Sequence, residues 1–197
     1  MNDFRLPLEQ MATSLAEAGH TQSSPPLEHW QPKPCGELPL EIDSQGQWWT
    51  ITETSKSAYR RPALVKMLSQ VLWCEPADYT PNSQRQPMYS LRTPHESVTI
   101  QVVDVPFTIV DYNWLTLPTA ALECTTNLGE KLIIGPQHPL IIRQISPFLP
   151  YTLVRRNLWA RFNRSSYYRL AHELLDNEQP FQITSQGHTY SLEPDSK

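Results

Sequence analysis

The sequence contains little glycine, and this scarcity excludes several common catalytic motifs. Its 197 residues include six glycines, and none of them forms a G-x-G-x-x-G, P-loop or G-x-S-x-G pattern. Those patterns wrap backbone N–H groups around a phosphate or hold a nucleophilic serine in a sharp turn. The chain therefore lacks the usual phosphate-cradling loop and the usual nucleophile elbow.

Cysteine is scarce as well. Cys35, Cys74 and Cys124 are odd in number and widely spaced, which suits free thiols in a reducing compartment better than a disulfide framework. No two cysteines are separated by two residues, and no two of the six histidines stand four apart with a Glu between them. We therefore expect no metal site, and we expect no cofactor.

Long apolar runs are missing too. The longest stretches, such as 132–134 and 140–142, fall far short of the roughly 20 residues of a membrane-spanning helix. The first residues carry Asp3 and Glu9 and show no signal-peptide pattern. We therefore expect a cytoplasmic protein without a membrane partner.

Charge is distributed unevenly along the chain. Residues 131–172 contain no Asp or Glu but seven Lys and Arg, while the remainder holds nine basic and twenty acidic residues, a balance of −11. This contrast predicts one anion-attracting face on an acidic body. The net charge of −4 argues against a general nucleic-acid binder.

Two segments about a hundred residues apart look like copies of one unit. Arg61–Leu72 matches Arg164–Leu175 in its basic and apolar positions, and the downstream strands Met88–Leu91 and Thr189–Leu192 are nearly identical. Such a repeat predicts two similar modules packed on each other, with a ligand at their seam.

Apolar alternation predicts mostly antiparallel strands. Leu38 to Ile42 and Trp48 to Ile51 read as one hairpin, and Leu122 to Thr126 with Lys131 to Ile134 read as another. Pro62 stands at a favoured first helical position. Because strands come in runs, we predict an α+β fold with a duplicated strand-helix-strand core.

The predicted domain layout has three parts. Residues 1–35 form a helix, around residues 4–15, and a Pro-rich linker; residues 36–94 form the first module; residues 95–197 form a larger, β-rich second module with the C-terminal repeat helix.

Arginines begin both repeat helices, at Arg61 and Arg164. A guanidinium beside the free N–H groups of a helix N-terminus can bind an anion. Alternatively, these arginines pair with acids such as Glu96 or Asp104, or lie in solvent.

Aromatic and basic residues interleave between Arg155 and Tyr168. Arg155 could hold a phosphate while Trp159 or Tyr167 stacks on a base. The alternative is that the rings belong to the core or to the module interface, since large rings usually dominate packing.

An ordered set of short motifs resembles the bacterial domain-of-unknown-function family 1285 from Trp30 to about Leu192. The motifs are Trp30–Gly36, Arg61–Val65, Thr93–Glu96, Asp104–Phe107, Thr126–Gly129, His138–Leu140 and Pro150–Tyr151. The resemblance implies a duplicated core, a C-terminal half superficially like a pleckstrin-homology fold, and an interface site for a nucleotide-like ligand in signalling. Family members often carry Arg-Pro at both helix starts, whereas the second copy here reads Arg164-Ser165.

These observations favour a binding protein over an enzyme. We expect an anionic, nucleotide-like ligand, with charge supplied by Arg61, Arg155 and Arg164. Asn127 would add a hydrogen bond, and Tyr167 or Trp159 a stacking surface. One alternative is a hydrolase or transferase that uses His95, Glu96 or Asp104 for proton transfer. Another is a protein-interaction adaptor with an exposed apolar patch. The oligomeric state stays open.

Overall fold

The structure is a computed structural model that describes residues 25–116, 119–176 and 181–194. The helix predicted around residues 4–15 lies outside the described residues. Within the described part, no helix is both long enough and apolar enough to span a bilayer.

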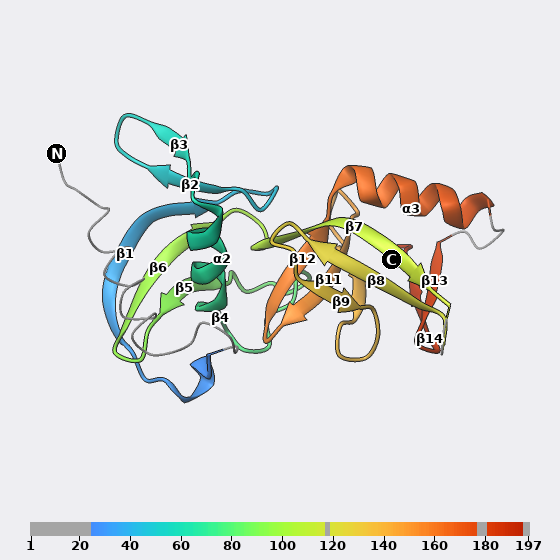
Figure 1. The fold of residues 1–197 in the computed structure, drawn as a ribbon, viewed down its shortest axis with the longest axis horizontal. Coiled ribbons are helices and arrows are strands. Elements are labelled where there is room, and N and C mark those ends of the chain that lie inside the picture. The colour runs from blue at the N-terminus through green and yellow to red at the C-terminus, as the bar shows by residue number, and fades with distance from the viewer. Residues whose placement is uncertain (1–24, 117–118, 177–180, 195–197) are drawn as a thin grey trace. The chain divides into compact units, whose positions relative to one another are not determined.

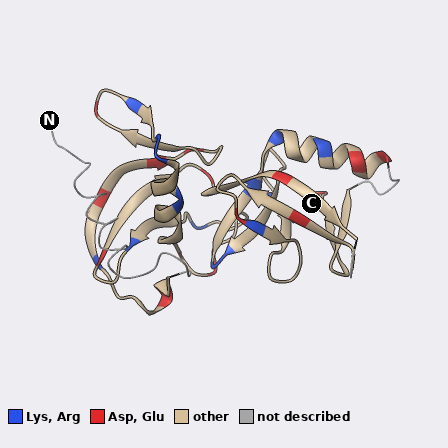
Figure 2. Ribbon diagram, in the orientation of Figure 1, with Lys and Arg blue, Asp and Glu red and all other residues tan. Residues whose placement is uncertain are grey.

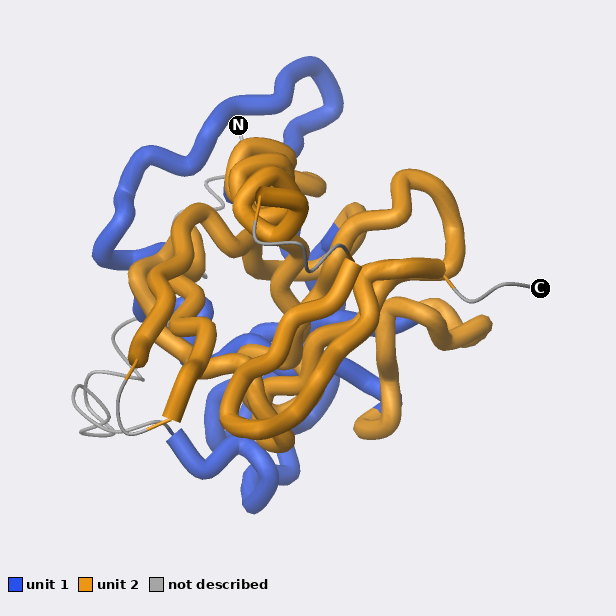
Figure 3. Tube along the Cα trace, turned by 90° about the vertical axis from the view of Figure 1, so that its right-hand side faces the viewer, with its two compact units in different colours: residues 1–42, 47–76, 87–102 blue, residues 43–46, 77–86, 103–197 orange. Residues whose placement is uncertain are grey.

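The chain forms two compact units, which Figure 3 shows in separate colours. Among the described residues, unit 1 comprises residues 25–42, 47–76 and 87–102. Unit 2 comprises the described residues from Val103 onward together with residues 43–46 and 77–86. Two short segments that separate strands of unit 1 in the sequence therefore belong to the compact body of unit 2.

Unit 1 is a curled six-stranded sheet with one α-helix against it (Figure 1). Its strands lie in the order β3-β2-β1-β6-β5-β4. The elements are η1 (Leu27–His29), β1 (Lys33–Ile42), β2 (Trp48–Ile51), β3 (Lys56–Ala58), α2 (Pro62–Gln70), β4 (Leu72–Glu75), β5 (Met88–Arg92) and β6 (Glu96–Val102).

The local patterns explain these elements. Alternate residues of β1, Leu38, Leu40 and Ile42, are buried, and the predicted hairpin with β2 is present. Helix α2 begins at Pro62, as predicted, and buries Val65 and Leu68.

Unit 2 holds a second six-stranded sheet, a longer helix and a small two-stranded sheet. The large sheet has the order β10-β11-β12-β7-β8-β9. Its elements are β7 (Phe107–Leu115), β8 (Ala121–Thr126), β9 (Lys131–Ile133), β10 (Leu140–Ile142), β11 (Pro150–Arg155), β12 (Leu158–Phe162), α3 (Arg164–Asp176), β13 (Gln182–Ser185) and β14 (His188–Ser191).

The two large sheets share one strand order, which confirms the predicted duplication and the α+β class. Each consists of two three-stranded meanders, and the first and last strands of each sheet pair in parallel, β1 with β6 and β7 with β12. All other pairs are antiparallel. The helices occupy different places in this order, because α2 precedes the fourth strand of its sheet and α3 follows the sixth.

Two predicted assignments differ from the structure. β6 lies between β1 and β5 in the first sheet, whereas the predicted second module began at residue 95. The sequence repeat equates β5 with β14. However, β5 belongs to the six-stranded sheet of unit 1, whereas β14 pairs with β13 in the small two-stranded sheet of unit 2. Alternation of apolar residues predicts a strand but does not identify its partner.

Helix α3 packs along β7 through both apolar and polar contacts. Leu170 and Leu174 are buried, and the hydroxyl of the buried Ser166 donates to the carbonyl of Ile109 at 3.0 Å. The Asn163 side chain caps the helix by accepting from the N–H of Ser166 at 2.7 Å.

Asn127 holds residues 43–46 within unit 2. Its amide nitrogen donates to the Gly46 carbonyl at 2.9 Å, and its oxygen accepts from the N–H of Thr108 at 3.1 Å. Gly46 has φ +75°, and a Cβ there would lie 2.6 Å from the Asn127 amide nitrogen. Only glycine fits this position without displacing Asn127.

Replacing Gly46 with Ala should therefore cost more than replacing a glycine with open space around it. We expect Gly46→Ala to lower the free energy of unfolding by about 2–4 kcal/mol, from backbone strain plus the clash. Gly129, with φ +79° and no atom within 4 Å of its added Cβ, is the matched control. Gly129→Ala should cost only about 1–2 kcal/mol. If urea denaturation gave the same loss of unfolding free energy for both variants, the close contact between residue 46 and Asn127 would not be the cause.

Candidate functional site

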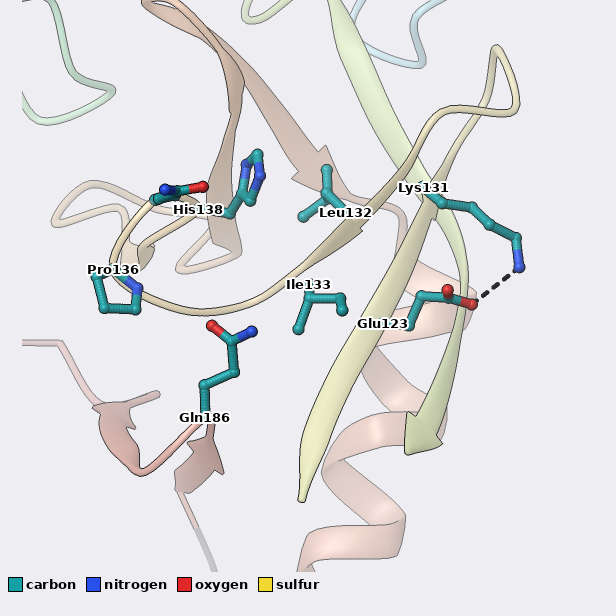
Figure 4. Close-up of a pocket in the computed structure, with 8 residues that line it drawn as sticks. Glu123, Lys131, Leu132, Ile133, Pro136, His138 and Gln186 are labelled. Carbon is teal, nitrogen blue, oxygen red and sulfur yellow. Dashed lines mark hydrogen bonds and ion pairs between the residues drawn. The ribbon is translucent and has the colours of Figure 1, made fainter. Parts of the chain in front are cut away.

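A pocket of about 610 Å³ in unit 2 is the candidate site (Figure 4). Its size lies within the range of small-ligand pockets, roughly 300–1,000 Å³. The lining combines polar and apolar side chains from β8, β9, the following turn and the β13–β14 turn: Glu123, Lys131, Leu132, Ile133, Pro136, Gln137, His138 and Gln186.

A buried hydroxyl positions the β13–β14 turn at this pocket. The N–H of Leu122 donates to Ser185 Oγ at 2.9 Å, and Ser185 Oγ donates to the carbonyl of Ile134 at 2.6 Å. The hydroxyl thus bridges β8 to the residue after β9, and Ser185 is fully buried. The next residue, Gln186, donates its N–H to the Ala120 carbonyl at 2.9 Å and reaches the pocket.

Gly135 allows Gln186 to approach the turn after β9. A Cβ on Gly135 would lie 2.1 Å from Oε1 of Gln186, so the amide side chain occupies the space above the glycine. Gly135 and His138 exchange backbone hydrogen bonds of 3.2 and 3.0 Å, which close a tight turn between them. Backbone hydrogen bonds therefore fix both the turn that carries Gln186 and the turn that carries His138.

The imidazole of His138 has a defined hydrogen-bonding role. Its Nδ1 lies 2.8 Å from the carbonyl oxygen of Leu153, and a carbonyl can only accept. Nδ1 therefore carries the proton, and in the neutral ring Nε2 is left as an acceptor.

The charged residues of the pocket form one neutral pair. Lys131 Nζ lies 2.9 Å from Glu123 Oε2. Figure 4 shows this pair on the side of the strands away from His138 and Gln186, with Leu132 and Ile133 between. The remaining lining offers amides, one imidazole and apolar surface, which suits a polar ligand of low charge.

The six residues predicted to bind a ligand do not line this pocket. Arg61 belongs to unit 1 and precedes α2, whereas the other five belong to unit 2. Within unit 2, Arg164 is exposed at the first position of α3, and Tyr167 is half-buried one turn later. Their joint role in one anion site stays a prediction.

Three of the predicted residues have structural contacts. Asn127 holds Gly46 and Thr108. The Trp159 ring is 4% exposed and donates its indole N–H to the Tyr79 carbonyl at 3.0 Å, so it packs in the core, as the alternative interpretation expected. Arg155 forms an ion pair with Glu130 and lies over the Phe107 ring, 4.8 Å from its centroid.

The basic stretch of the sequence pairs with acids from earlier in unit 2. Figure 2 marks the positions of the basic and acidic residues along the ribbon. The ion pairs are Lys131–Glu123, Arg143–Asp104, Arg155–Glu130, Arg161–Asp104 and Arg169–Asp111. All of the acids lie between residues 104 and 130, and all of the cations follow them. The uneven charge along the sequence is therefore largely balanced by internal pairing in the fold.

Asp104 is the centre of a partly buried polar network. One carboxylate oxygen accepts from Arg143 at 3.0 Å, and the other accepts from the Tyr151 hydroxyl at 2.8 Å and lies 3.4 Å from Arg161. Arg161 also donates to the Ser44 carbonyl. Burial, together with the charge of Asp104, raises the pKa of Tyr151 to about 12, so this phenol keeps its proton at neutral pH and donates a hydrogen bond to Asp104.

The three residues of the predicted catalytic alternative are divided between the two units, and proton transfer by any one of them stays a prediction. His95, just before β6, and Glu96, the first residue of β6, are exposed in unit 1, where the N–H of each donates to the Thr93 hydroxyl at 3.3 and 3.0 Å. Asp104 belongs to unit 2. Among the described residues, no three His, Cys, Asp or Glu side chains gather in a group that could hold a metal ion.

The pocket is lined partly by residues of two turns. The segments Gly135-Pro136-Gln137-His138 and Gln186-Gly187 are typical turn sequences, and both turns are present. No local pattern indicates that two turns about fifty residues apart meet at β9.

The fold defines a class of protein built from two units with the same strand order and a polar pocket in the second. The chain matches the "Domain of unknown function (DUF1285), N-terminal domain" over residues 25–105 and the "Protein of unknown function (DUF1285), C-terminal domain" over residues 106–192. It belongs to the DUF1285 family, as the sequence motifs indicated.

Two crystal structures of DUF1285 family proteins are similar to this chain. The protein from Silicibacter pomeroyi DSS-3 has 26% identity and a TM-score of 0.66, over 90% of this chain and 93% of that chain. The protein from Shewanella baltica OS155 has 25% identity and a TM-score of 0.48, over 69% of this chain and 92% of that chain. A comparison with curated proteins finds no match.

The Asp104 network should be far more important for stability than an exposed ion pair. Asp104→Asn leaves two guanidinium groups without a carboxylate, one of them on Arg161, which is 9% exposed. We expect a loss of about 3–5 kcal/mol in the free energy of unfolding. Asp111→Asn removes an exposed partner of Arg169 and should change stability little. Similar urea midpoints for the two variants would contradict a stabilising network.

Proposed function

We propose that this protein is a binding protein rather than an enzyme, and that unit 2 holds its ligand in the pocket beside β9. The arrangement of His138 and Gln186 carries this proposal. The hydrogen bond to Leu153 orients the His138 ring, and Gln186 lies over Gly135. Fixed polar groups around an apolar floor are typical of small-ligand sites.

The charge of the pocket bears on the chemical class of the ligand. An anionic, nucleotide-like ligand, as expected from the sequence, would have to compete with Glu123 for Lys131. An uncharged polar ligand can instead use the amides of Gln137 and Gln186 and the acceptor nitrogen of His138 without breaking an ion pair. The pocket therefore supports an uncharged polar ligand better than a multiply charged one.

A cytoplasmic location and a signalling role belong to the same proposal. A reducing compartment suits the three free thiols, of which Cys74 and Cys124 are buried. Burial raises the pKa of the Cys74 thiol to about 12, which keeps it protonated and unreactive. A protein that binds a ligand without converting it could act in signalling by changing its state when the ligand is present.

Thermal-shift screening against nucleotides, amides and short peptides tests the proposal. A ligand at about 100 times its Kd should add about 2.7 kcal/mol to the free energy of unfolding and raise Tm. Gln186→Ala should abolish that rise, while Gln182→Ala, an exposed glutamine on β13, should keep it.

Arg164→Ala separates this pocket from the arginine site predicted from the sequence. The pocket proposal expects the variant to respond as the parent does, whereas an anion site at α3 expects the response to vanish. A ligand whose Tm shift depends on Arg164 and ignores Gln186 would place the site at α3 and contradict the pocket.

A further inference from the structure

The outer edge of β9 has no strand partner among the described residues. β9 is the last strand in the order of its sheet, and its other side pairs with β8 in the register Glu123↔Ile133, Cys124↔Leu132 and Thr125↔Lys131. The pocket is lined by all three residues of β9. The candidate site is therefore lined by a strand at the edge of its sheet.

The flanking hydrogen bonds show which backbone groups face that edge. The backbone N–H of Thr126 donates to the carbonyl of Glu130, and the backbone N–H of Ile134 donates to the carbonyl of Leu122. Because hydrogen-bonded pairs alternate along an antiparallel ladder, Leu132 faces β8. The N–H and C=O groups of Lys131 and Ile133 consequently point away from β8, toward the open edge.

The opposite edge of the same sheet already binds an amide group. At β10, the Asn82 amide nitrogen donates to the Ile142 carbonyl at 3.0 Å, and its oxygen accepts from the N–H of Gln144 at 3.0 Å. Asn82 thus fills a carbonyl and an N–H two residues apart, as a neighbouring strand would. β9 presents the same pair, the carbonyl of Lys131 and the N–H of Ile133.

The side chain most able to block the edge of β9 is directed elsewhere. Lysine on an edge strand often prevents strand pairing. Here the Lys131 ammonium reaches Glu123 on β8, on the side away from His138 and Gln186 (Figure 4). Among the described residues no strand pairs with this edge, and the half-buried side chain of Ile133 lines the pocket.

We propose that the ligand of unit 2 is an extended peptide segment that adds to β9 as a strand. This inference rests on the proposed function, since it names the ligand class for the same pocket. A single amide or a nucleobase edge would satisfy two of the four outward groups of Lys131 and Ile133. An extended backbone satisfies all four, and its alternate side chains face the pocket lining.

The test uses the full chain and a library of hexapeptides with acetylated and amidated ends. Binders found by fluorescence polarisation are remade with single amide-to-ester replacements, each of which removes one N–H donor. Strand addition predicts about tenfold weaker binding at alternate positions and little change at the positions between them. A peptide whose ester series shows no alternation, or a library without any binder, overturns the inference.

A matched pair of protein variants provides the reciprocal test. Ile133→Pro removes the outward N–H, which proline tolerates on an edge strand, and should weaken peptide binding about tenfold or more. Ile133→Val keeps the N–H and should bind as the parent does. Equal binding by the two variants overturns strand addition. Because the ester series uses the unaltered protein, the inference stays testable even if Ile133→Pro folds poorly.

The two proposals fail in different ways. A nucleotide or amide that binds the parent, is lost in Gln186→Ala and ignores Ile133→Pro would overturn the peptide inference and leave the pocket proposal standing. A peptide that ignores both Gln186→Ala and Ile133→Pro would overturn both.

Discussion

The parallel pairing of the first and last strands is the constraint on which each unit depends. Joining two three-stranded meanders through β1 and β6, or through β7 and β12, places the third and fourth strands at the sheet edges. In unit 2 these edges are β9 and β10. Asn82 covers part of the β10 edge, while β9 faces a pocket. The position of the candidate site therefore follows from the topology.

Internal pairing uses most of the cations of unit 2. Carboxylates between residues 104 and 130 pair with Arg143, Arg155, Arg161 and Arg169, and Asp104 serves two of these arginines in a partly buried network. A run without acidic residues suggests an anion-binding face when read along the sequence. In the fold, the same run meets its counter-charges across neighbouring strands, which leaves the pocket beside β9 nearly neutral.

Local patterns in the sequence predict the hairpins and the helix start, but they do not predict which distant strands pair. Alternation and turn residues identify the hairpins β1–β2 and β8–β9, and Pro62 marks the start of α2. The parallel pairing of β6 with β1 joins segments about sixty residues apart, and no local pattern encodes it. The candidate site is even harder to predict from the sequence. The Ser185 hydroxyl brings Gln186 to β9 through hydrogen bonds to Leu122 and Ile134, and these bonds can form only once β8 and β9 are paired.

Amide hydrogen exchange along β9 tests the central claim most directly. An open edge that offers its backbone to a ligand requires the Leu132 N–H to be protected by β8, and the N–H groups of Lys131 and Ile133 to exchange quickly in the free protein. NMR exchange rates that alternate in this way would support the account. Equal protection of all three amides would show that another segment already covers the edge, and would contradict it.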